Sequence, residues 1–460
     1  MQITTSKNHV YCSRDFYWLV GGFESLIFLS SASIGGHFSQ SPYSLGVENL
    51  LFTVVMLASF SALGLYNQQQ QFKFSEIFLR ILLGFAGGSL VLGSLFYLSS
   101  VLIAPQGLWG LLPSGLAFVS VLSLRLLVQY YRGQTKVLQN TLIFGSGQRA
   151  LSILRESQRD NSPLKNEIFG FMSVAEETIC IPSTQLINTN QPLADFALKH
   201  GIQQIVVALD DDTHLVPQNL LDCRNHQIKI TEISDFFEKY ALKIDIDSLK
   251  ISHVIFDIQS KNSLQDHLCR LFDLALSGFL FLLVSPLLLI TALAIFIENG
   301  FKSPIFYSQV RVGLNNVPFT IWKFRSMSVN AEKKGEVQWA QADDARVTAV
   351  GKIIRRYRID ELPQLFNIIK GDMSIVGPRP ERPEFVAQLQ QTIPYYLERH
   401  QVKVGLTGWA QINYPYGASD EDAKEKLKYD LYYIKHHSLW LDFVTLLQTV
   451  EVILLGKGVR

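Results

Sequence analysis

Two adjacent carboxylates, Asp360 and Glu361, follow a cluster of arginines that includes Arg358. A Gly-Pro-Arg-Pro turn with Arg379 at its third position follows after one short helix's worth of residues. Carboxylates can hold Mg²⁺ or attack phosphorus, and guanidinium groups bind pairs of phosphate oxygens. The stretch therefore predicts phosphate chemistry.

The same residues also fit a purely structural role. Asp360 can cap a helix N-terminus, with Glu361 in the first turn, where the helix dipole favours both charges. Neighbouring side chains within a helix do not converge on one ligand, so a joint site requires a helix start with non-helical dihedrals. Pro363 is compatible with such a first turn. Spacing alone leaves both interpretations open.

Lys323 and Arg325 form a second basic pair, at positions i and i+2. In an extended segment this spacing puts both side chains on one face, where they can contact a diphosphate. An exposed polar strand face is the alternative that the spacing leaves open.

Four sequence blocks resemble the conserved blocks of one known family. In chain order they are Ser308-Gln-Val-Arg-Val-Gly313, Trp322-Lys-Phe-Arg-Ser-Met327, Asp360-Glu-Leu-Pro-Gln-Leu365 with Val376-Gly-Pro-Arg-Pro380, and Gly405-Leu-Thr-Gly-Trp-Ala-Gln-Ile-Asn413. Their types and order resemble the bacterial sugar transferases, the monotopic polyprenyl-phosphate hexose-1-phosphate transferases. The resemblance runs from Arg270 to the C-terminus, and the front of the chain resembles the long branch that initiates exopolysaccharide synthesis.

The resemblance implies transfer of a sugar 1-phosphate from a UDP-sugar to undecaprenyl phosphate, with release of UMP. Asp360 is then the expected nucleophile of a covalent aspartyl-phosphosugar intermediate, and Mg²⁺ is the expected cofactor, held by Asp360 and Glu361. A two-step route suits this chemistry because direct attack by a lipid phosphate brings two anions together. The expected phosphate-binding residues are Lys323, Arg325, Arg358 and Arg379, with Pro378 and Pro380 fixing the turn that carries Arg379.

The first 131 residues contain four long apolar segments: Phe16–Ser33, Leu50–Tyr66, Ile77–Leu98 and Leu108–Tyr130. Each approaches the roughly 20 residues needed to span a bilayer. Lys7, Lys73 and Lys136 lie in the segments on one side, whereas 35–49 and 99–107 contain no lysine or arginine. The excess of positive charge on the cytoplasmic side therefore predicts a four-helix transmembrane region over 1–132 with both ends in the cytoplasm.

A degenerate dinucleotide-binding fingerprint follows, with Gly145, Gly147 and Ala150 between a predicted strand and a predicted helix. These glycines can let a pyrophosphate approach the helix N-terminus, although any tight strand-to-helix turn uses glycine too. The next predicted strand, which begins at Ile168, lacks an acidic residue at its end. We expect a Rossmann-like α/β domain over 133–250 with a regulatory or assembly role, and a linker over 251–269.

The last 191 residues, 270–460, form the expected catalytic domain, which is mainly helical and monotopic. Its apolar run can cross a membrane by length, but Ser285 and Pro286 interrupt it. A proline inside a helix removes a hydrogen bond and kinks the helix, at a cost of about 3 kcal/mol or more. The resemblance implies a re-entrant membrane helix over 271–297, and an ordinary kinked span is the alternative. Ser438–Leu455 is expected to form a terminal helix on the cytoplasmic leaflet, with a core helix as the alternative.

Composition narrows the class of protein. Hydrophobic residues make up 48% of the chain, and 41 basic against 40 acidic residues argue against a general nucleic-acid binder. The four cysteines have no paired spacing typical of zinc or of disulfides, which fits a reducing compartment. His436 and His437 also lack metal-ligand spacing, and we expect them at a helix end. Relatives often carry a basic residue where this chain has Cys269.

The resemblance implies a multi-pass protein of the bacterial inner membrane with its catalytic domain on the cytoplasmic side. Its expected partners are a UDP-sugar, undecaprenyl phosphate, membrane lipid, further copies of the chain and other polysaccharide assembly proteins. Two alternatives from other classes remain. A non-catalytic scaffold of a polysaccharide assembly complex does not require Asp360 and Glu361. A membrane-anchored nicotinamide-dependent enzyme acting on nucleotide sugars would use Gly145 and Gly147.

Overall fold

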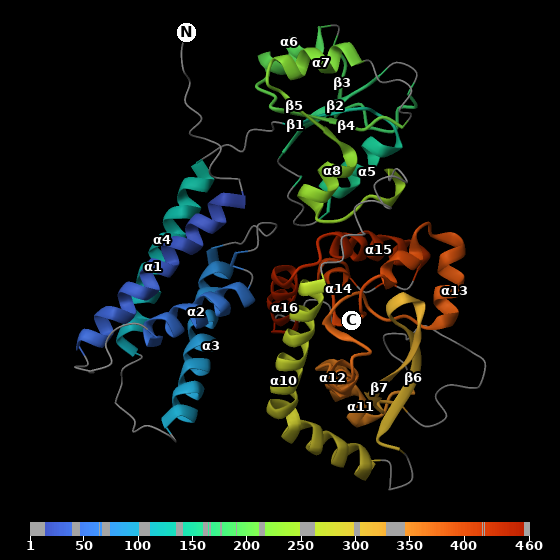
Figure 1. Ribbon diagram of the computed structural model, residues 1–460. Helices are drawn as coiled ribbons and strands as arrows, with labels where there is room; N and C mark the ends of the chain where they lie inside the picture. Colours follow the sequence, from blue (N-terminus) through green and yellow to red (C-terminus); the bar gives the residue numbers. More distant parts are fainter. Residues whose placement is uncertain are drawn as a thin grey trace. The chain divides into compact units, whose positions relative to one another are not determined.

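A computed structural model divides the chain into two compact units, Met1–Ala241 and Leu242–Arg460 (Figure 1). It describes residues 14–38, 47–63, 65–66, 74–100, 111–134, 141–159, 164, 167–174, 177–189, 191–210, 217–248, 263–298, 304–327, 346–415, 417 and 419–454. Lys7, Lys73, Lys136 and most of the expected linker lie outside these residues.

Four helices open the N-terminal unit: α1 (Arg14–Phe38), α2 (Val47–Ala62), α3 (Phe74–Ser100) and α4 (Leu111–Gln134). They pack around a shared apolar core in which the rings of Phe28, Phe60 and Phe85 meet edge to face. Glu24 is fully buried and pairs with Arg125 of α4 at 2.5 Å. This pairing satisfies the two buried charges, which would otherwise be costly in an apolar core.

The rest of the N-terminal unit is a parallel sheet with helices on both faces. Its strands are β1 (Thr141–Phe144), β2 (Ile168–Met172), β3 (Leu186–Ile187), β4 (Gln204–Val207) and β5 (Lys229–Glu232), in the order β3-β2-β1-β4-β5. Its helices are α5 (Gln148–Ser157), α6 (Leu193–Lys199), α7 (Pro217–Asn225) and α8 (Ile233–Phe236), which continues into η3 (Phe237–Ala241).

Apolar residues of β1 alternate between two separate cores, one on each side of the sheet. Leu142 packs in the core with α6 and α7, and Ile143 packs in the core with α5 and α8. Strands buried on both faces are typical of doubly wound α/β domains. The structure therefore confirms the expected α/β organisation of this segment.

The short segment after Ala241 belongs to the C-terminal unit. Ile244 and Ile246 are buried in that unit's main core, and η4 (Ile246–Ser248) ends the segment. Lys243 Nζ lies 3.2 Å from a carboxylate oxygen of Glu425. The end of the expected Rossmann-like domain, Lys243–Ser248, thus packs with the catalytic segment.

The long helix α10 (Ser263–Glu298) contains the expected re-entrant segment and begins before it. Within the described residues it is the one helix long and apolar enough to cross a membrane. Leu282 and Leu289 are 74% and 73% exposed, so this surface is not covered by the rest of the C-terminal unit. Pro286 lies inside the helix, and Figure 1 shows a clear bend in its second half.

The first turns of α10 make polar contacts instead. Arg270 donates to the carbonyl oxygens of Ile368 and Ile369 at 2.6 and 2.8 Å. Asp273 accepts from the Ser374 hydroxyl at 2.9 Å and from the Ile375 amide at 3.0 Å. These bonds fix the start of α10 to the elements that carry the site.

Short elements build the remainder of the C-terminal unit. They are β6 (Phe306–Val312), η5 (Leu314–Asn316), β7 (Pro318–Phe324), α11 (Ala349–Arg356), η6 (Ile359–Gln364), α12 (Leu365–Lys370), β8 (Ser374–Val376), α13 (Pro383–Thr392), η7 (Tyr396–His400), β9 (Gly405–Thr407), α14 (Trp409–Asn413), α15 (Asp420–Lys435) and α16 (Leu439–Leu454). Strands β6 and β7 form an antiparallel hairpin, and β8 pairs in parallel with β9.

Helix α16, the expected terminal helix, packs on the core with one face and exposes the other. Leu441, Val444 and Leu446 contact the main core, whereas Trp440 and Phe443 are exposed. The helix therefore combines the two alternatives that its apolar spacing suggested, a core helix and a surface helix.

Candidate active site

The paired carboxylates lie at the start of a short 3₁₀ helix. Arg358 precedes this helix, η6, with a left-handed backbone at φ 57°, and Asp360 and Glu361 occupy its first turn. A positive φ is uncommon in residues other than glycine and marks local strain, which the surrounding packing must hold. The carboxylate pair therefore lies at a helix start, where the non-helical dihedrals belong to Arg358, and Pro363 lies within the helix.

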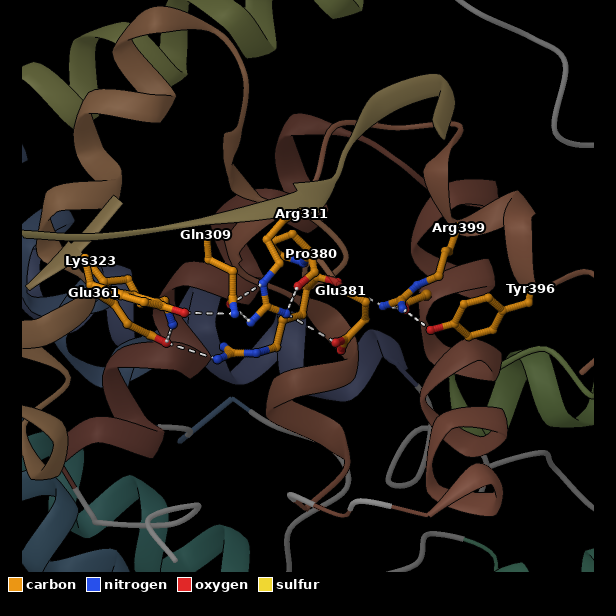
Figure 2. A network of polar contacts seen from close by, with 11 residues as sticks. Gln309, Arg311, Lys323, Glu361, Pro380, Glu381, Tyr396 and Arg399 are labelled. Carbon is orange, nitrogen blue, oxygen red and sulfur yellow. Dashed lines mark hydrogen bonds and ion pairs between the residues drawn. The ribbon is translucent and has the colours of Figure 1, made fainter. Parts of the chain in front are cut away.

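Strand β7 brings Lys323 to this helix. Asn367 of α12 accepts from the Trp322 amide at 3.1 Å and donates to the Thr320 carbonyl at 2.7 Å. These two bonds fix the strand beside the helix that follows η6. Lys323 then projects toward Glu361 (Figure 2).

Three cations surround the Glu361 carboxylate. Lys323 Nζ lies 3.2 Å and Arg379 Nη2 lies 3.0 Å from Oε1, and Arg358 Nε lies 3.3 Å from Oε2. The structure thus brings together four of the predicted site residues. Glu361 is buried, with only 7% of its surface exposed, so these charges interact with little screening by water.

Burial and charge act in opposite directions on Glu361. Burial alone would raise the pKa of this carboxyl, but the charges of Lys323, Arg379 and Arg358 hold the pKa well below its usual value. Burial lowers the pKa of Lys323, and Glu361 opposes that shift. Glu361 is therefore ionised and acts as the centre of a cationic cluster.

Asp360 differs from its neighbour. Burial and the adjacent Glu361 charge raise the pKa of the Asp360 carboxyl. No hydrogen bond or ion pair of this carboxylate is found within the part of the chain that the structure describes. A carboxylate that is unpaired and poorly solvated is more basic than usual and is available to attack an electrophile.

The turn that carries Arg379 is held through its backbone. The Gly377 amide donates to the Thr407 carbonyl, and the Gly405 amide donates to the Pro378 carbonyl, both at 2.9 Å. A Cβ on Gly377 would lie 2.2 Å from the Lys403 carbonyl oxygen, so glycine is required for this close approach. Pro378 thus helps to tie the predicted turn to β9.

Two further arginines bind the backbone of the same turn. Arg311 of β6 donates to the Pro380 carbonyl at 3.0 Å, and Arg399 of η7 donates to the Arg379 carbonyl at 3.1 Å. Figure 2 shows Arg311 and Pro380 between the Glu361 cluster and the Arg399–Tyr396 pair. Neither arginine is among the predicted site residues, although Arg311 lies in one of the blocks that resemble the family.

Other predicted site residues lie elsewhere. Arg325 directs its Nε to the Pro304 carbonyl at 2.9 Å, and none of its described contacts is with the carboxylate pair. Ser285 and Pro286 lie in α10, where the Ser285 hydroxyl donates to the Leu282 carbonyl at 2.8 Å. Their location agrees with a role in shaping the helix.

A hollow lies over the cationic cluster. It is lined by Arg311, Ile321, Lys323, Glu361, Gln364, Arg379, Pro380, Gly405 and Leu406. Three of these residues are cations, and Pro380 of the turn that carries Arg379 also lines the hollow. Such a surface suits a ligand with several negative oxygens.

The donor set also fits a magnesium ion that binds together with phosphates. Asp360 and Glu361 offer hard carboxylate oxygens, which Mg²⁺ prefers, and Mg²⁺ sites commonly combine one or two carboxylates with substrate phosphates. The surrounding cations outnumber the two carboxylates. The cluster therefore favours a ligand that carries its own negative charge over a bare dication.

In the glycine turn of the Rossmann-like segment, carboxylates of the chain itself bind the backbone amides. Asp210 accepts from the Gln148 and Arg149 amides at 2.7 and 2.8 Å. Glu177 accepts from the Ser146 amide at 2.6 Å. A Cβ on Gly147 would lie 2.2 Å from an Asp210 oxygen. The chain's own carboxylates thus occupy the amides that a pyrophosphate needs, which argues against the nicotinamide-dependent alternative.

Comparisons with known proteins agree with the geometry of the C-terminal unit. The profile of the family described as "Bacterial sugar transferase" matches residues 264–456. An uncharacterized sugar transferase of Bacillus subtilis is 41% identical over 195 residues, which are 42% of this chain and 89% of that protein. The chain belongs to the bacterial sugar transferase family.

Other family members extend the comparison. An N-acetylgalactosaminephosphotransferase of Aeromonas hydrophila, named for UDP-N-acetylgalactosamine and undecaprenyl phosphate, is 51% identical over 178 residues. These are 39% of this chain and 41% of that protein, so the match spans less than half of either. An uncharacterized sugar transferase of Haemophilus influenzae is 27% identical over 418 residues, 85% of this chain and 84% of that protein. Similarity within the family therefore reaches the N-terminal unit as well.

Proposed function

We propose that this protein transfers a sugar 1-phosphate from a UDP-sugar to undecaprenyl phosphate and releases UMP, as the first membrane step of exopolysaccharide synthesis. Family membership and the name of the Aeromonas hydrophila relative support the reaction class. Relatives from Klebsiella pneumoniae and Escherichia coli are both named UDP-glucose:undecaprenyl-phosphate glucose-1-phosphate transferase, which supports the same class. One observation carries the proposal further. Asp360 is an unpaired carboxylate with a raised pKa beside the buried Glu361, which is paired with three cations.

The reaction proceeds in two displacements at one phosphorus atom. A carboxylate oxygen of Asp360 forms a bond to the β-phosphorus of the UDP-sugar, the bond from that phosphorus to the bridging oxygen breaks, and its electrons leave with UMP. A phosphate oxygen of undecaprenyl phosphate then attacks the same phosphorus. The Asp360 carboxylate leaves, and the sugar becomes linked to the lipid through a diphosphate. Each displacement therefore has one anionic nucleophile, first the Asp360 carboxylate and then the lipid phosphate.

The cations have defined tasks in this scheme. Lys323, Arg358 and Arg379 bind the diphosphate oxygens, and the buried Glu361 keeps all three directed into the site. Pro378 and Pro380 fix the turn that carries Arg379. Mg²⁺, held by Asp360 and Glu361 when the donor binds, would offset the diphosphate charge and stabilise the departing UMP.

The active site must lie at the membrane surface, because the phosphate of the lipid substrate lies at the headgroup plane. We infer that α10 enters the inner membrane and returns to the cytoplasmic side at the bend near Pro286, and that α1–α4 cross it. The exposed apolar surface of α10 and the exposed aromatic residues of α16 support the membrane position of the C-terminal unit. The four long apolar segments of the sequence support the crossing of α1–α4. The site then meets cytosolic nucleotide sugars and membrane-bound lipid together.

The test uses the full chain in nanodiscs with Mg²⁺, undecaprenyl phosphate and a panel of UDP-sugars that begins with UDP-N-acetylgalactosamine and UDP-glucose. We expect wild-type protein to release UMP with at least one donor and the Asp360→Asn variant to release none. An Asp420→Asn variant, which alters a carboxylate in the first turn of α15, should match the wild type.

The covalent intermediate has a separate readout. Without lipid acceptor, wild-type protein should release UMP up to about one equivalent, and peptide mass spectrometry should find a sugar phosphate on Asp360. UMP release that requires the lipid even in the first turnover, with no modified peptide, would contradict the two-step route. An absence of UMP with every donor would contradict the proposed reaction and favour the scaffold alternative.

A further inference from the structure

Three metal-ligating side chains from separate parts of the chain meet outside the carboxylate pair. Cys269 lies in the second turn of α10, His437 lies between α15 and α16, and Asp442 lies in the first turn of α16. Their ligand atoms all lie within 4.8 Å of one another. His437 Nε2 is 3.6 Å from an oxygen of Asp442.

We propose that Cys269, His437 and Asp442 form a zinc site that joins α10 to α16. One sulfur, one imidazole nitrogen and one carboxylate oxygen are the ligand types that Zn²⁺ accepts, with metal–ligand distances of about 2.0–2.3 Å. A thiolate together with an imidazole disfavours Mg²⁺ and Ca²⁺, which prefer oxygen ligands. Three protein ligands leave the fourth tetrahedral position for water.

The surroundings of the cluster resemble a supported metal site. The second oxygen of Asp442 accepts from the Tyr433 hydroxyl at 2.6 Å, which orients the carboxylate. Gln265 of α10 donates to the His437 carbonyl and fixes that turn. A hydrogen bond to a metal-ligating side chain, such as that from Tyr433 to Asp442, commonly stabilises metal binding.

The cluster is shielded without being closed. The side chain of Asp442 is 5% exposed and that of His437 is 22% exposed, so an ion can enter while bulk water is largely excluded. The carboxylate pair of the candidate active site contributes no ligand to the cluster. The zinc is therefore expected to act on structure and not on phosphoryl transfer.

The position gives the metal a specific task. Helix α10 is already fixed to the catalytic elements by Arg270 and Asp273, within four residues of Cys269. Zinc would add a link from the same turns to α16, which also contacts α10, β8 and β9. Bound metal stabilises the folded state because a preformed site does not exist in the unfolded chain.

The test uses full-length protein with an affinity tag that lacks histidine, purified without chelator. We expect about one zinc per chain by mass spectrometry of the metal. Cobalt substitution should produce the near-ultraviolet band of a thiolate-bound Co²⁺. Cys269→Ser should abolish this band, and Tyr433→Phe should weaken zinc affinity by about 10- to 100-fold. Cys180→Ser and His436→Gln are the matched controls and should retain metal.

A second measurement needs only wild-type protein. Zinc should slow the alkylation of Cys269 and leave Cys180 unaffected, and a chelator should reverse the protection and lower the melting temperature. The proposal would be wrong if wild type and Cys269→Ser held equal zinc, or if zinc left the alkylation of Cys269 unchanged. The cluster would then be a His437–Asp442 ion pair with a neighbouring thiol.

Discussion

The Arg399 guanidinium donates to the backbone carbonyl oxygen of Arg379 at 3.1 Å. The same guanidinium bonds to Asp430 at 2.8 Å and to the Tyr396 hydroxyl at 2.7 Å, and its side chain is 7% exposed. Arg399 therefore cannot move without breaking contacts to Asp430 of α15 and to Tyr396 of its own helix, η7. Arg399 therefore holds the backbone of Arg379, whose side chain contacts Glu361 (Figure 2).

Removing this support should slow the reaction. We expect Arg399→Met to lower kcat by up to about 100-fold, because small displacements of a positioning group are costly to the rate. Arg399→Lys should recover part of the rate. Steady-state UMP release gives kcat and KM, and Arg356→Met on α11 serves as a control. A variant that melts earlier but keeps the wild-type kcat would show that Arg399 supports only the fold.

Lys323 and Arg325 should differ, although they are two residues apart. Lys323 contacts Glu361 at 3.2 Å, whereas Arg325 bonds to the Pro304 carbonyl. We expect Lys323→Met to lower kcat/KM by about 100-fold or more, the cost of losing one preorganised charge-stabilising group. Arg325→Met should have a much smaller effect. Equal losses in the two variants would place Arg325 on the substrate phosphates too.

Acid should destabilise the C-terminal unit through His400. Its Nδ1 lies 2.7 Å from the Asn316 side-chain oxygen, and burial together with the Arg399 charge lowers the pKa of His400 to about 3. As pH falls from 6.5 toward 3, the unfolded chain takes up a proton that the folded protein does not. Folding stability is therefore present above pH 6.5 and is lost as the pH falls.

The variant His400→Gln isolates this contribution. The wild type should lose up to about 1.4 kcal/mol more unfolding free energy per pH unit than the variant below pH 6.5. Chemical denaturation at several pH values, in the same detergent, measures the difference. Parallel pH profiles for the two proteins would mean that His400 is protonated in the folded state.

The Rossmann-like segment should fold without a nucleotide. Because Asp210 already caps the Gln148 and Arg149 amides, NAD should leave the melting temperature of the wild type unchanged. Asp210→Ala should lower stability by about 0.5–2 kcal/mol, as loss of a helix cap does. Asp222→Ala on α7 is the control. A clear rise in melting temperature with NAD would show that the carboxylates yield to a pyrophosphate.

The sequence by itself determined the family and located the carboxylate pair. The residues of a block such as Asp360-Glu-Leu-Pro are adjacent in the chain. The block can therefore be recognised from the sequence without a structure. The bend of α10 was predictable for the same reason. Pro286 lacks a backbone N–H wherever the helix lies.

Tertiary structure alone decided which charges meet. Lys323 is 38 residues from Glu361 along the chain, and Cys269 is far from His437, so no local spacing could reveal either association. The hydrogen bonds from the Gln148 and Arg149 amides to Asp210 were equally unpredictable. A glycine turn has the same sequence whether its amides bind a pyrophosphate or a carboxylate of the chain itself. Such contacts depend on how distant elements pack, and the free energy of packing is a property of the whole fold.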